Sequence, residues 1–289
     1  MCTRDRHALI LGYLLHQSGF KIRYAIDDSS RLHPLIASEG TMYDRPGYAF
    51  DGLTYYAYTK PSSNAARICD FDYPGSQTMR LAIDKAPQFT YAPGETRQMT
   101  AYGYPDLSVT LTVNKNLCDF FTDYPNASPD RSPYSKWAIH GNTPASREVI
   151  NQLYPALRQA VKGKNQIQAV NMLLKLAQTF PYGYDDKIWG HDRAFWMDES
   201  WQYPLSDCED HAVNFTRMVR DILGLDAVLI YYPGHLSAAV AFTEGQTNGD
   251  YVVYGGRRYT VCDATCQYGP IGYSGKYDNS QDILIPLTR

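Results

Sequence analysis

Residues 206–224 read Ser-Asp-Cys-Glu-Asp-His-Ala-Val-Asn-Phe-Thr-Arg-Met-Val-Arg-Asp-Ile-Leu-Gly, and the C-terminal half of the chain is interpreted outward from them. Apolar residues recur in this segment at helical spacing, and we expect the helix to end at Gly224. Ser206 and Glu209 match an S-x-x-E capping box, which predicts an N-cap at Ser206 and places Cys208 at the second helical position. The helix dipole and a cationic neighbour both lower the pKa of a thiol in such a place. We therefore expect Cys208 to be a reactive thiol that faces the following strands.

The residues after this helix predict an antiparallel sheet. Four strand-like runs follow one another, at residues 227–232, 236–242, 251–254 and 258–263. His235 lies at the start of the second run and Asp263 at the end of the fourth. If these two strands pair antiparallel, the two side chains meet at one sheet edge, where Asp263 orients the imidazole and its other nitrogen faces Cys208. The three residues then form a Cys-His-Asp triad.

Each of the three residues also has an ordinary structural explanation. A cysteine at a helix start is more often a small core residue, and a histidine beside a turn is usually solvated. An aspartate before Ala-Thr usually caps a strand end. The three occur at intervals of 235 − 208 = 27 and 263 − 235 = 28 residues, each at the end of an element. Their joint occurrence favours a catalytic site.

Three motifs together resemble a known family. S-D-C-E-D-H-A begins at Ser206, P-G-H-L-S-A-A-V at Pro233, and Y-T-V-C-D-A-T at Tyr259. They are similar to those of the bacterial transglutaminase-like superfamily, whose members are related to papain in fold, and the resemblance covers about residues 136–289.

The resemblance implies a role for each triad residue. Cys208 is the expected nucleophile, His235 the general base and Asp263 the orienting residue. Many members of the superfamily carry an aromatic residue two positions after the histidine. This chain has Ser237 there, so the shape of its groove is expected to differ.

The expected activity is cysteine-dependent acyl transfer on amide bonds through a thioester. Hydrolysis of a peptide, protein or cell-wall peptide is preferred over transglutamination, because nothing in the sequence indicates a site for a second amine substrate. The oxyanion hole needs two donors: the backbone N–H of Cys208 is the natural first, and Gln202 is a candidate second, with Trp201 and Tyr203 as alternatives. We expect no metal and no other cofactor, and no segment has the acidic spacing of an EF-hand.

Two other interpretations stay open. The chain contains 25 tyrosines, so a non-catalytic binding or assembly module could hold polysaccharide or peptide on a Tyr-rich surface. A weaker interpretation is a metal site built on Cys262, Cys266 and a histidine. Neither of these cysteines is expected to be catalytic, because neighbouring residues on a strand point to opposite faces and Cys262 should face away from His235.

The pattern along the chain predicts an α+β fold in three segments. Residues 1–62 hold a His-Ala-started helix ended by Gly and then strand-like runs, which echo the C-terminal order. We interpret them as a degenerate transglutaminase-like copy without a nucleophile, since Arg4 stands where the other copy has Cys208. Residues 63–135 predict a small β-rich module with a connecting loop, and residues 136–289 the catalytic domain, a helix packed on an antiparallel sheet.

Composition excludes several classes of protein. A chain of 289 residues with 44% hydrophobic and 20% charged residues is typical of a globular protein, and six cysteines are too few for a disulfide scaffold. The 27 Lys and Arg residues and the 30 Asp and Glu residues give a net charge of 27 − 30 = −3, which argues against a dedicated nucleic-acid binder. No apolar run approaches the roughly 20 residues of a membrane span. The first residues imitate a signal peptide only loosely, so the compartment is left open, and a longer, exported bacterial protein stays among the alternatives.

Overall fold

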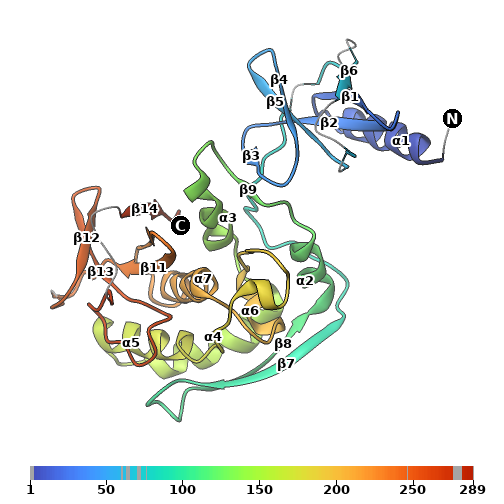
Figure 1. The fold of residues 1–289 in the computed structure, drawn as a ribbon. Helices are drawn as coiled ribbons and strands as arrows, with labels where there is room; N and C mark the ends of the chain where they lie inside the picture. Colours follow the sequence, from blue (N-terminus) through green and yellow to red (C-terminus); the bar gives the residue numbers. More distant parts are fainter. Residues whose placement is uncertain are drawn as a thin grey trace. The chain divides into compact units, whose positions relative to one another are not determined.

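A computed structural model describes residues 3–59, 61–62, 66–69, 73–75, 77–245, 247–275 and 282–288 (Figure 1). The contacts within it divide the chain into two compact units. Unit 1 comprises Met1–Ala82 and Pro125–Lys136, and unit 2 comprises Ile83–Tyr124 and Trp137–Arg289. This division differs from the three segments expected from the sequence.

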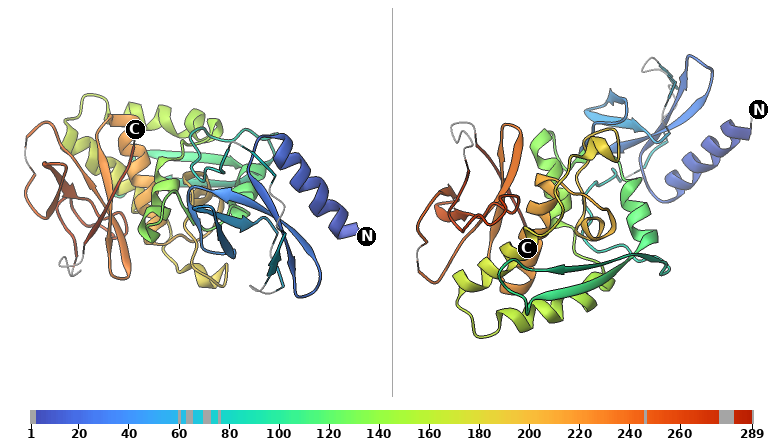
Figure 2. Two further views of the ribbon diagram at one scale, coloured as in Figure 1. Left: turned by 90° about the horizontal axis from the view of Figure 1, so that it is seen from above. Right: turned by 60° about the horizontal axis from the view of Figure 1, so that its bottom comes forward.

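Unit 1 packs one helix, α1 (Thr3–Gln17), against an antiparallel sheet of order β4-β5-β2-β1-β6 (Figures 1 and 2). The strands are β1 (Ile22–Asp27), β2 (Leu32–Ser38), β4 (Gly47–Phe50), β5 (Leu53–Ala57) and β6 (Ala66–Ile68). A short pairing of β3 (Thr41–Met42) with β9 (Ala127–Ser128) follows, and then the 3₁₀ turn η1 (Pro133–Ser135). The core of the sheet is a buried cluster of small and aromatic side chains, Ala25, Leu35, Ala37, Tyr55 and Ala57.

Unit 2 is built on an antiparallel sheet of order β12-β13-β11-β10-β14. Its strands are β10 (Ala227–Tyr232), β11 (His235–Val240), β12 (Tyr251–Tyr254), β13 (Arg257–Val261) and β14 (Ile283–Pro286). Its helices are α2 (Lys115–Thr122), α3 (Lys136–Asn142), α4 (Arg147–Val161), α5 (Gln166–Ala177), α6 (Met197–Gln202) and α7 (Cys208–Met218). A short 3₁₀ turn, η2 (Asp185–Lys187), precedes α6, and the π-helical segment η3 (Val219–Leu223) extends α7 to Gly224. Helix α7 packs directly on β11, which brings its N-terminal end to the sheet.

The hairpin of β7 (Pro93–Thr100) and β8 (Ser108–Asn114) belongs to unit 2. The alternation predicted for residues 107–113 is confirmed, because Val109, Leu111 and Val113 are buried while the residues between them are more exposed. The buried face packs on α4 and α6. This burial of the apolar face explains why residues 83–124 do not form the separate β module expected from the sequence.

The two units share one strand order. Helix α1 in unit 1 and helix α7 in unit 2 each precede the five strands of one sheet. Reading β1, β2, β4, β5, β6 as β10, β11, β12, β13, β14 converts one sheet order into the other. The register agrees as well, since Leu35 pairs with Ala57 in unit 1 as Ala239 pairs with Val261 in unit 2. The chain has the mixed α+β fold class expected from the sequence. The shared strand order of the two sheets corresponds to the repeat expected from the sequence.

Helix length bears on membrane insertion. Helices α1 and α4 have 15 residues each, which at 1.5 Å per residue corresponds to about 22 Å. A bilayer core is about 30 Å thick. Within the described part of the chain, no helix is both long enough and apolar enough to cross a membrane.

Candidate active site

Cys208 is the first residue of α7. The N-cap is Asp207, one residue later than expected, and its N–H donates to Asp210 Oδ2 at 3.0 Å. Ser206 does not cap the helix, because its backbone is used in a strand-like pairing in which its N–H donates to Pro181 O at 3.0 Å. Cys208 can still supply the expected first oxyanion donor after this shift. The N–H of a first helical residue has no acceptor within its own helix.

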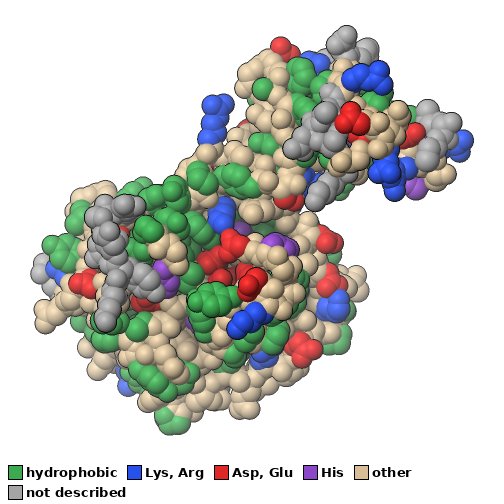
Figure 3. Space-filling model, in the orientation of Figure 1, with side chains coloured by type: hydrophobic (Ala, Val, Ile, Leu, Met, Phe, Trp, Pro, Cys, Tyr) green, Lys and Arg blue, Asp and Glu red, His purple; other side chains and the backbone are tan. Residues whose placement is uncertain are grey.

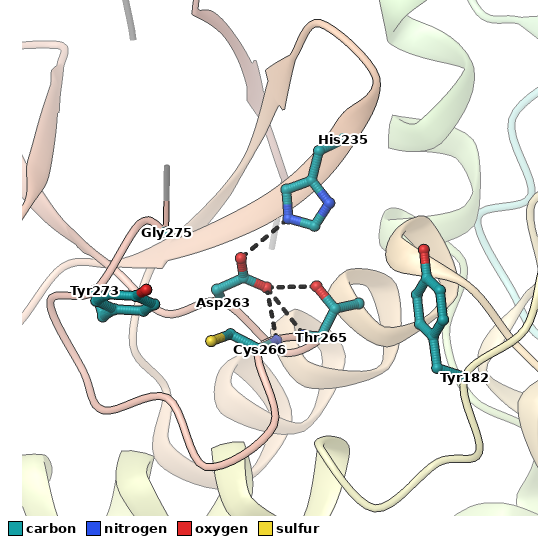
Figure 4. Close-up of a pocket in the computed structure, with 7 residues that line it drawn as sticks. All are labelled: Tyr182, His235, Asp263, Thr265, Cys266, Tyr273 and Gly275. Carbon is teal, nitrogen blue, oxygen red and sulfur yellow. Dashed lines mark hydrogen bonds and ion pairs between the residues drawn. The ribbon is translucent and has the colours of Figure 1, made fainter. Parts of the chain in front are cut away.

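His235 and Asp263 meet at the edge of the sheet, as predicted. His235 begins β11, Asp263 follows β13 by two residues, and these strands pair antiparallel. Nε2 of His235 lies 3.0 Å from Oδ2 of Asp263, with side chains that are 5% and 4% exposed. Figure 4 shows the second ring nitrogen turned away from the carboxylate.

The surroundings of Asp263 keep it ionised. Its Oδ1 accepts from the backbone N–H of Thr265 at 2.9 Å and from the Thr265 hydroxyl at 2.6 Å. Burial would raise the pKa of Asp263, but the hydrogen bonds from His235 and Thr265 and the charge of His235 outweigh it and lower the pKa. An ionised carboxylate only accepts, so Nε2 of His235 carries the hydrogen and Nδ1 is the basic nitrogen of the ring.

Cys208 lies beside the start of β11. Its Sγ accepts from the backbone N–H of Leu236 at 3.4 Å, and Leu236 is the residue after His235. The thiol donates to Glu209 Oε2 at 3.1 Å. Burial, followed by the charges of Glu209 and Asp207, raises the pKa of the Cys208 thiol. The lowered pKa expected from the helix position is therefore wrong, and this structure holds a protonated thiol.

A cavity of about 460 Å³ opens beside the His235–Asp263 pair (Figure 4). Its lining combines the pair with aromatic and small polar residues, namely Tyr182, His235, Asp263, Thr265, Cys266, Tyr273 and Gly275. Figure 4 shows Tyr182 and Tyr273 on opposite sides of Asp263, and both rings are partly exposed. A volume of this size is typical of sites that bind small molecules or single side chains.

The geometry does not support Gln202 as an oxyanion donor. Its side-chain oxygen accepts from Glu95 N–H at 2.9 Å, and its backbone carbonyl accepts from Arg97 Nη2 at 3.3 Å. These bonds tie Gln202 to β7. Among the described residues, it makes no hydrogen bond to Cys208.

The two alternatives to Gln202 differ in whether a donor is available. The Tyr203 hydroxyl is engaged with the Thr122 hydroxyl at 2.7 Å. Trp201 is fully buried, and its Nε1–H has no hydrogen-bond partner in the described part of the chain. Of these two alternatives, Trp201 therefore has the donor without a partner among the described residues.

Cys262 and Cys266 do not assemble a metal site. Cys262 is fully buried and its thiol points to Thr260 O at 3.5 Å, whereas Cys266 lines the cavity with Asp263. Neither occurs in the groups of described residues that bring three ligand atoms together. Cys266 is nevertheless a second thiol beside the candidate site, so it is the natural control for Cys208.

Two positioning residues were missed by the sequence analysis. Gln178 Nε2 donates to Asp263 O at 3.1 Å, and His211 Nδ1 lies 3.1 Å from Ala264 O. Burial lowers the pKa of His211 to about 4, so the ring is neutral and Nδ1 donates. The only signal in the sequence was a polar residue on or beside a helix face predicted to be buried.

Comparisons with known proteins leave the family unassigned. No protein-family model, no curated protein and no solved structure matches this chain. The resemblance to transglutaminase-like enzymes stays a prediction carried by the motifs around Cys208, His235 and Asp263. Inference about the chemistry rests on the geometry of the site.

Proposed function

We propose that this protein is a cysteine-dependent acyl-transfer enzyme that hydrolyses amide bonds. The carrying observation is the buried hydrogen bond of 3.0 Å between His235 Nε2 and Asp263 Oδ2. A carboxylate that fixes one ring nitrogen leaves the other in place for proton transfer. The thiol of Cys208 reaches the backbone immediately after His235, at the N-terminus of a helix. This chemistry requires that Sγ of Cys208 come within hydrogen-bond reach of His235 Nδ1, as in other enzymes with a nucleophile, a base and an orienting group.

The first half of the reaction forms a thioester. The protonated thiol of Cys208 must first break its hydrogen bond to Glu209. His235 Nδ1 then takes the thiol proton as Sγ bonds to the amide carbon of the substrate. The carbonyl oxygen gains the negative charge, which the N–H of Cys208 stabilises. The C–N bond then breaks, and the departing amine takes the proton from His235.

The second half returns the enzyme to its starting state. Water attacks the thioester while His235 accepts one of its protons. The carboxylic acid leaves, and Sγ of Cys208 regains a proton. A primary amine in place of water would give transglutamination. Hydrolysis remains our choice, because the sequence indicates no site for a second amine.

The cavity suggests where the substrate lies. Tyr182 and Tyr273 offer two rings on either side of Asp263, and aromatic side chains bind apolar groups and the faces of sugars. A peptide or cell-wall peptide segment with its scissile amide near His235 fits this lining. Ser237 is buried on β11 and is not among the residues that line the cavity.

One observation favours the second candidate, a non-catalytic binding module. The pKa of the Cys208 thiol is raised by burial and by the acidic neighbours Glu209 and Asp207, which is opposite to the usual tuning of a catalytic thiol. In that case the aromatic cavity would hold its ligand without turnover. The two functions are separated by whether product forms.

The test is turnover on a panel of peptide, isopeptide and cell-wall cross-link substrates, read by mass spectrometry of products. We expect the parent protein to release amine and carboxylic acid, and Cys208→Ser to be inactive. The matched control is Cys266→Ser, which should retain activity although Cys266 lines the cavity with His235 and Asp263. Equal turnover by the parent and Cys208→Ser would refute the cysteine mechanism, whereas binding without turnover across the panel would replace the enzyme with the binding module.

A further inference from the structure

Carboxylates from two segments converge at the start of α7. Asp185 lies in η2, Asp192 in the loop after it, and Asp207 caps α7. One oxygen of each carboxylate lies within 4.8 Å of the others. Asp185 and Asp207 are only 4% and 7% exposed, while Asp192 is exposed. Figure 3 shows acidic side chains gathered in a hollow on the face of unit 2.

An unpaired oxygen gives independent evidence for a ligand at this place. Oδ1 of Asp207 is buried and has no hydrogen-bond partner in the described part of the chain. A buried carboxylate oxygen without a partner loses its hydration without a compensating bond, which destabilises the fold. One oxygen of Asp207 lies within 4.8 Å of an oxygen of each of the other two carboxylates, so a cation shared with them would be a partner for this buried side chain.

The protein supplies little positive charge here. Among the described residues, Asp185 and Asp207 form no ion pair with a lysine or arginine. The nearby Arg193 pairs with Glu199 through its guanidinium and gives Asp185 only its backbone N–H, at 2.7 Å.

We propose that Asp185, Asp192 and Asp207 bind a hard divalent cation. Carboxylate oxygens are the ligands that Ca²⁺ and Mg²⁺ prefer, and the exposed Asp192 leaves a path for the ion and its remaining waters. Ca²⁺ is favoured because it accepts irregular sets of oxygens, whereas Mg²⁺ demands a near-ideal octahedron. The bound ion turns repulsion between the carboxylates into attraction and ties residues 185–192 to the start of α7. The site is independent of the proposed function.

A competing site must be distinguished. Asp207 also groups with Cys208 and Glu209, whose ligand atoms lie within 4.8 Å of one another. That set contains a thiol and suits Zn²⁺, which would consume the proposed nucleophile. A Cys208→Ser variant separates the two sites, because it removes a ligand from one and none from the other.

The experiment measures ion binding to the metal-free full chain. Tb³⁺, a luminescent substitute for Ca²⁺, is excited through Trp189, which lies between Asp185 and Asp192 in the chain, and is then displaced by Ca²⁺ or Mg²⁺. We expect one ion per chain and tighter binding of Ca²⁺ than of Mg²⁺. Asp185→Asn and Asp192→Asn should each weaken binding about tenfold or more, since even outer partners of a metal contribute that much. The matched control is Asp186→Asn, an exposed neighbour of Asp185 outside the cluster.

The outcomes are separable. Absence of Ca²⁺, Mg²⁺ and Tb³⁺ binding at millimolar concentration overturns the proposal, and so does unchanged affinity in Asp192→Asn. Asp192 is exposed, so its variant decides the question even where Asp185→Asn fails to fold. Cys208→Ser should bind Ca²⁺ like the parent while being catalytically inactive. Loss of binding in Cys208→Ser would move the ion to the thiol-containing group and refute this site.

Discussion

At the scale of single residues, opposing electrostatic effects act on Cys208. A helix N-terminus stabilises a negative charge by about 0.3–1 kcal/mol when exposed. Burial shifts pKa values by several units, each worth about 1.4 kcal/mol, and Glu209 and Asp207 act in the same direction as burial. The sequence shows the helix start but not the depth at which the thiol is buried. The larger effect was therefore invisible to the capping-box argument.

This balance predicts the pH dependence of thiol labelling in metal-free protein. A thiol reacts only when ionised, so a raised pKa keeps Cys208 protonated at pH 7, and its labelling rate should climb as the pH increases. We expect iodoacetamide to modify Cys208 more slowly than Cys69 at pH 7, by mass spectrometry at each cysteine. Glu209→Gln should accelerate labelling of Cys208. Faster labelling of Cys208 than of Cys69 below pH 7 would show that helix dipole and imidazole prevail.

Asp263→Asn should lower kcat/KM by about 10²–10⁴, because an amide no longer fixes the tautomer in which His235 Nε2 carries the hydrogen. The expected KM is nearly unchanged, since the carboxylate orients the base. The control is Thr265→Val, which removes one hydroxyl hydrogen bond to Asp263 and should have a smaller effect. Full activity in Asp263→Asn would remove Asp263 from the mechanism.

Gln202→Ala tests the oxyanion role that the sequence favoured. Loss of a true oxyanion donor costs about 10²–10³ in kcat. The Gln202 side chain accepts a hydrogen bond from the backbone N–H of Glu95. We therefore expect kcat to fall less than tenfold and the contact between α6 and β7 to become less stable. Steady-state kinetics and thermal unfolding measure the two effects. A hundredfold drop in kcat with unchanged stability would restore Gln202 to the oxyanion hole.

At the scale of elements, the sequence predicted local structure and the meeting of His235 with Asp263, but it did not predict contacts outside the strand pairing. The bounds of β10 and β12 and the helix end at Gly224 agree with the predictions, because hydrophobic alternation and glycine are local signals. The N-cap moved from Ser206 to Asp207 because Ser206 is recruited by a distant segment. Contacts between residues far apart in the chain leave no local signal.

Gln178 illustrates such a contact and yields a prediction. It caps the C-terminus of α5, and its amide donates to the carbonyls of Asp263 and Gly269, both at 3.1 Å. Gln178→Ala removes the amide that donates to Asp263 O, while Gly269 O keeps its bond from Lys175 Nζ at 2.9 Å. The loss should cost about 1–3 kcal/mol of unfolding free energy. Because the segment carrying Asp263 loosens, kcat should fall while the cavity still binds substrate. Denaturant unfolding and kinetics check this, and an unchanged kcat at reduced stability would make Gln178 purely structural.

At the scale of the whole molecule, two sheets of one topology carry different residues at matching places. Thr59 follows β5 by two residues, as Asp263 follows β13. Its hydroxyl lies 2.7 Å from Nδ1 of His33, whose Nε2 lies 3.1 Å from Asp27 Oδ2. Arg4, at the position matched to Cys208, supplies no thiol. Unit 1 thus holds a buried polar network at the sheet edge where unit 2 holds its candidate site.

The network in unit 1 predicts acid sensitivity. Burial would raise the pKa of Asp27, but hydrogen bonds from Ser62, Arg31 and His33 outweigh it and lower the pKa. A carboxyl group whose folded pKa is lowered stabilises the fold above its unfolded pKa of about 3.9 and loses that contribution as the pH falls toward the folded pKa. We therefore expect amide-exchange protection in β1 and β2 to decline below about pH 4.

Asp27→Asn should reproduce that loss at pH 7, because the amide cannot accept the same set of hydrogen bonds as an ionised carboxylate. Hydrogen exchange read by mass spectrometry compares peptides from β1 and β2 with those from β10 and β11, which contribute nothing to this network. The exposed neighbour variant Asp28→Asn is the control and should exchange like the parent. Protection of β1 and β2 that is the same at pH 7 in Asp27→Asn and the parent would mean that apolar packing around Leu35 and Tyr55 holds unit 1 without the network.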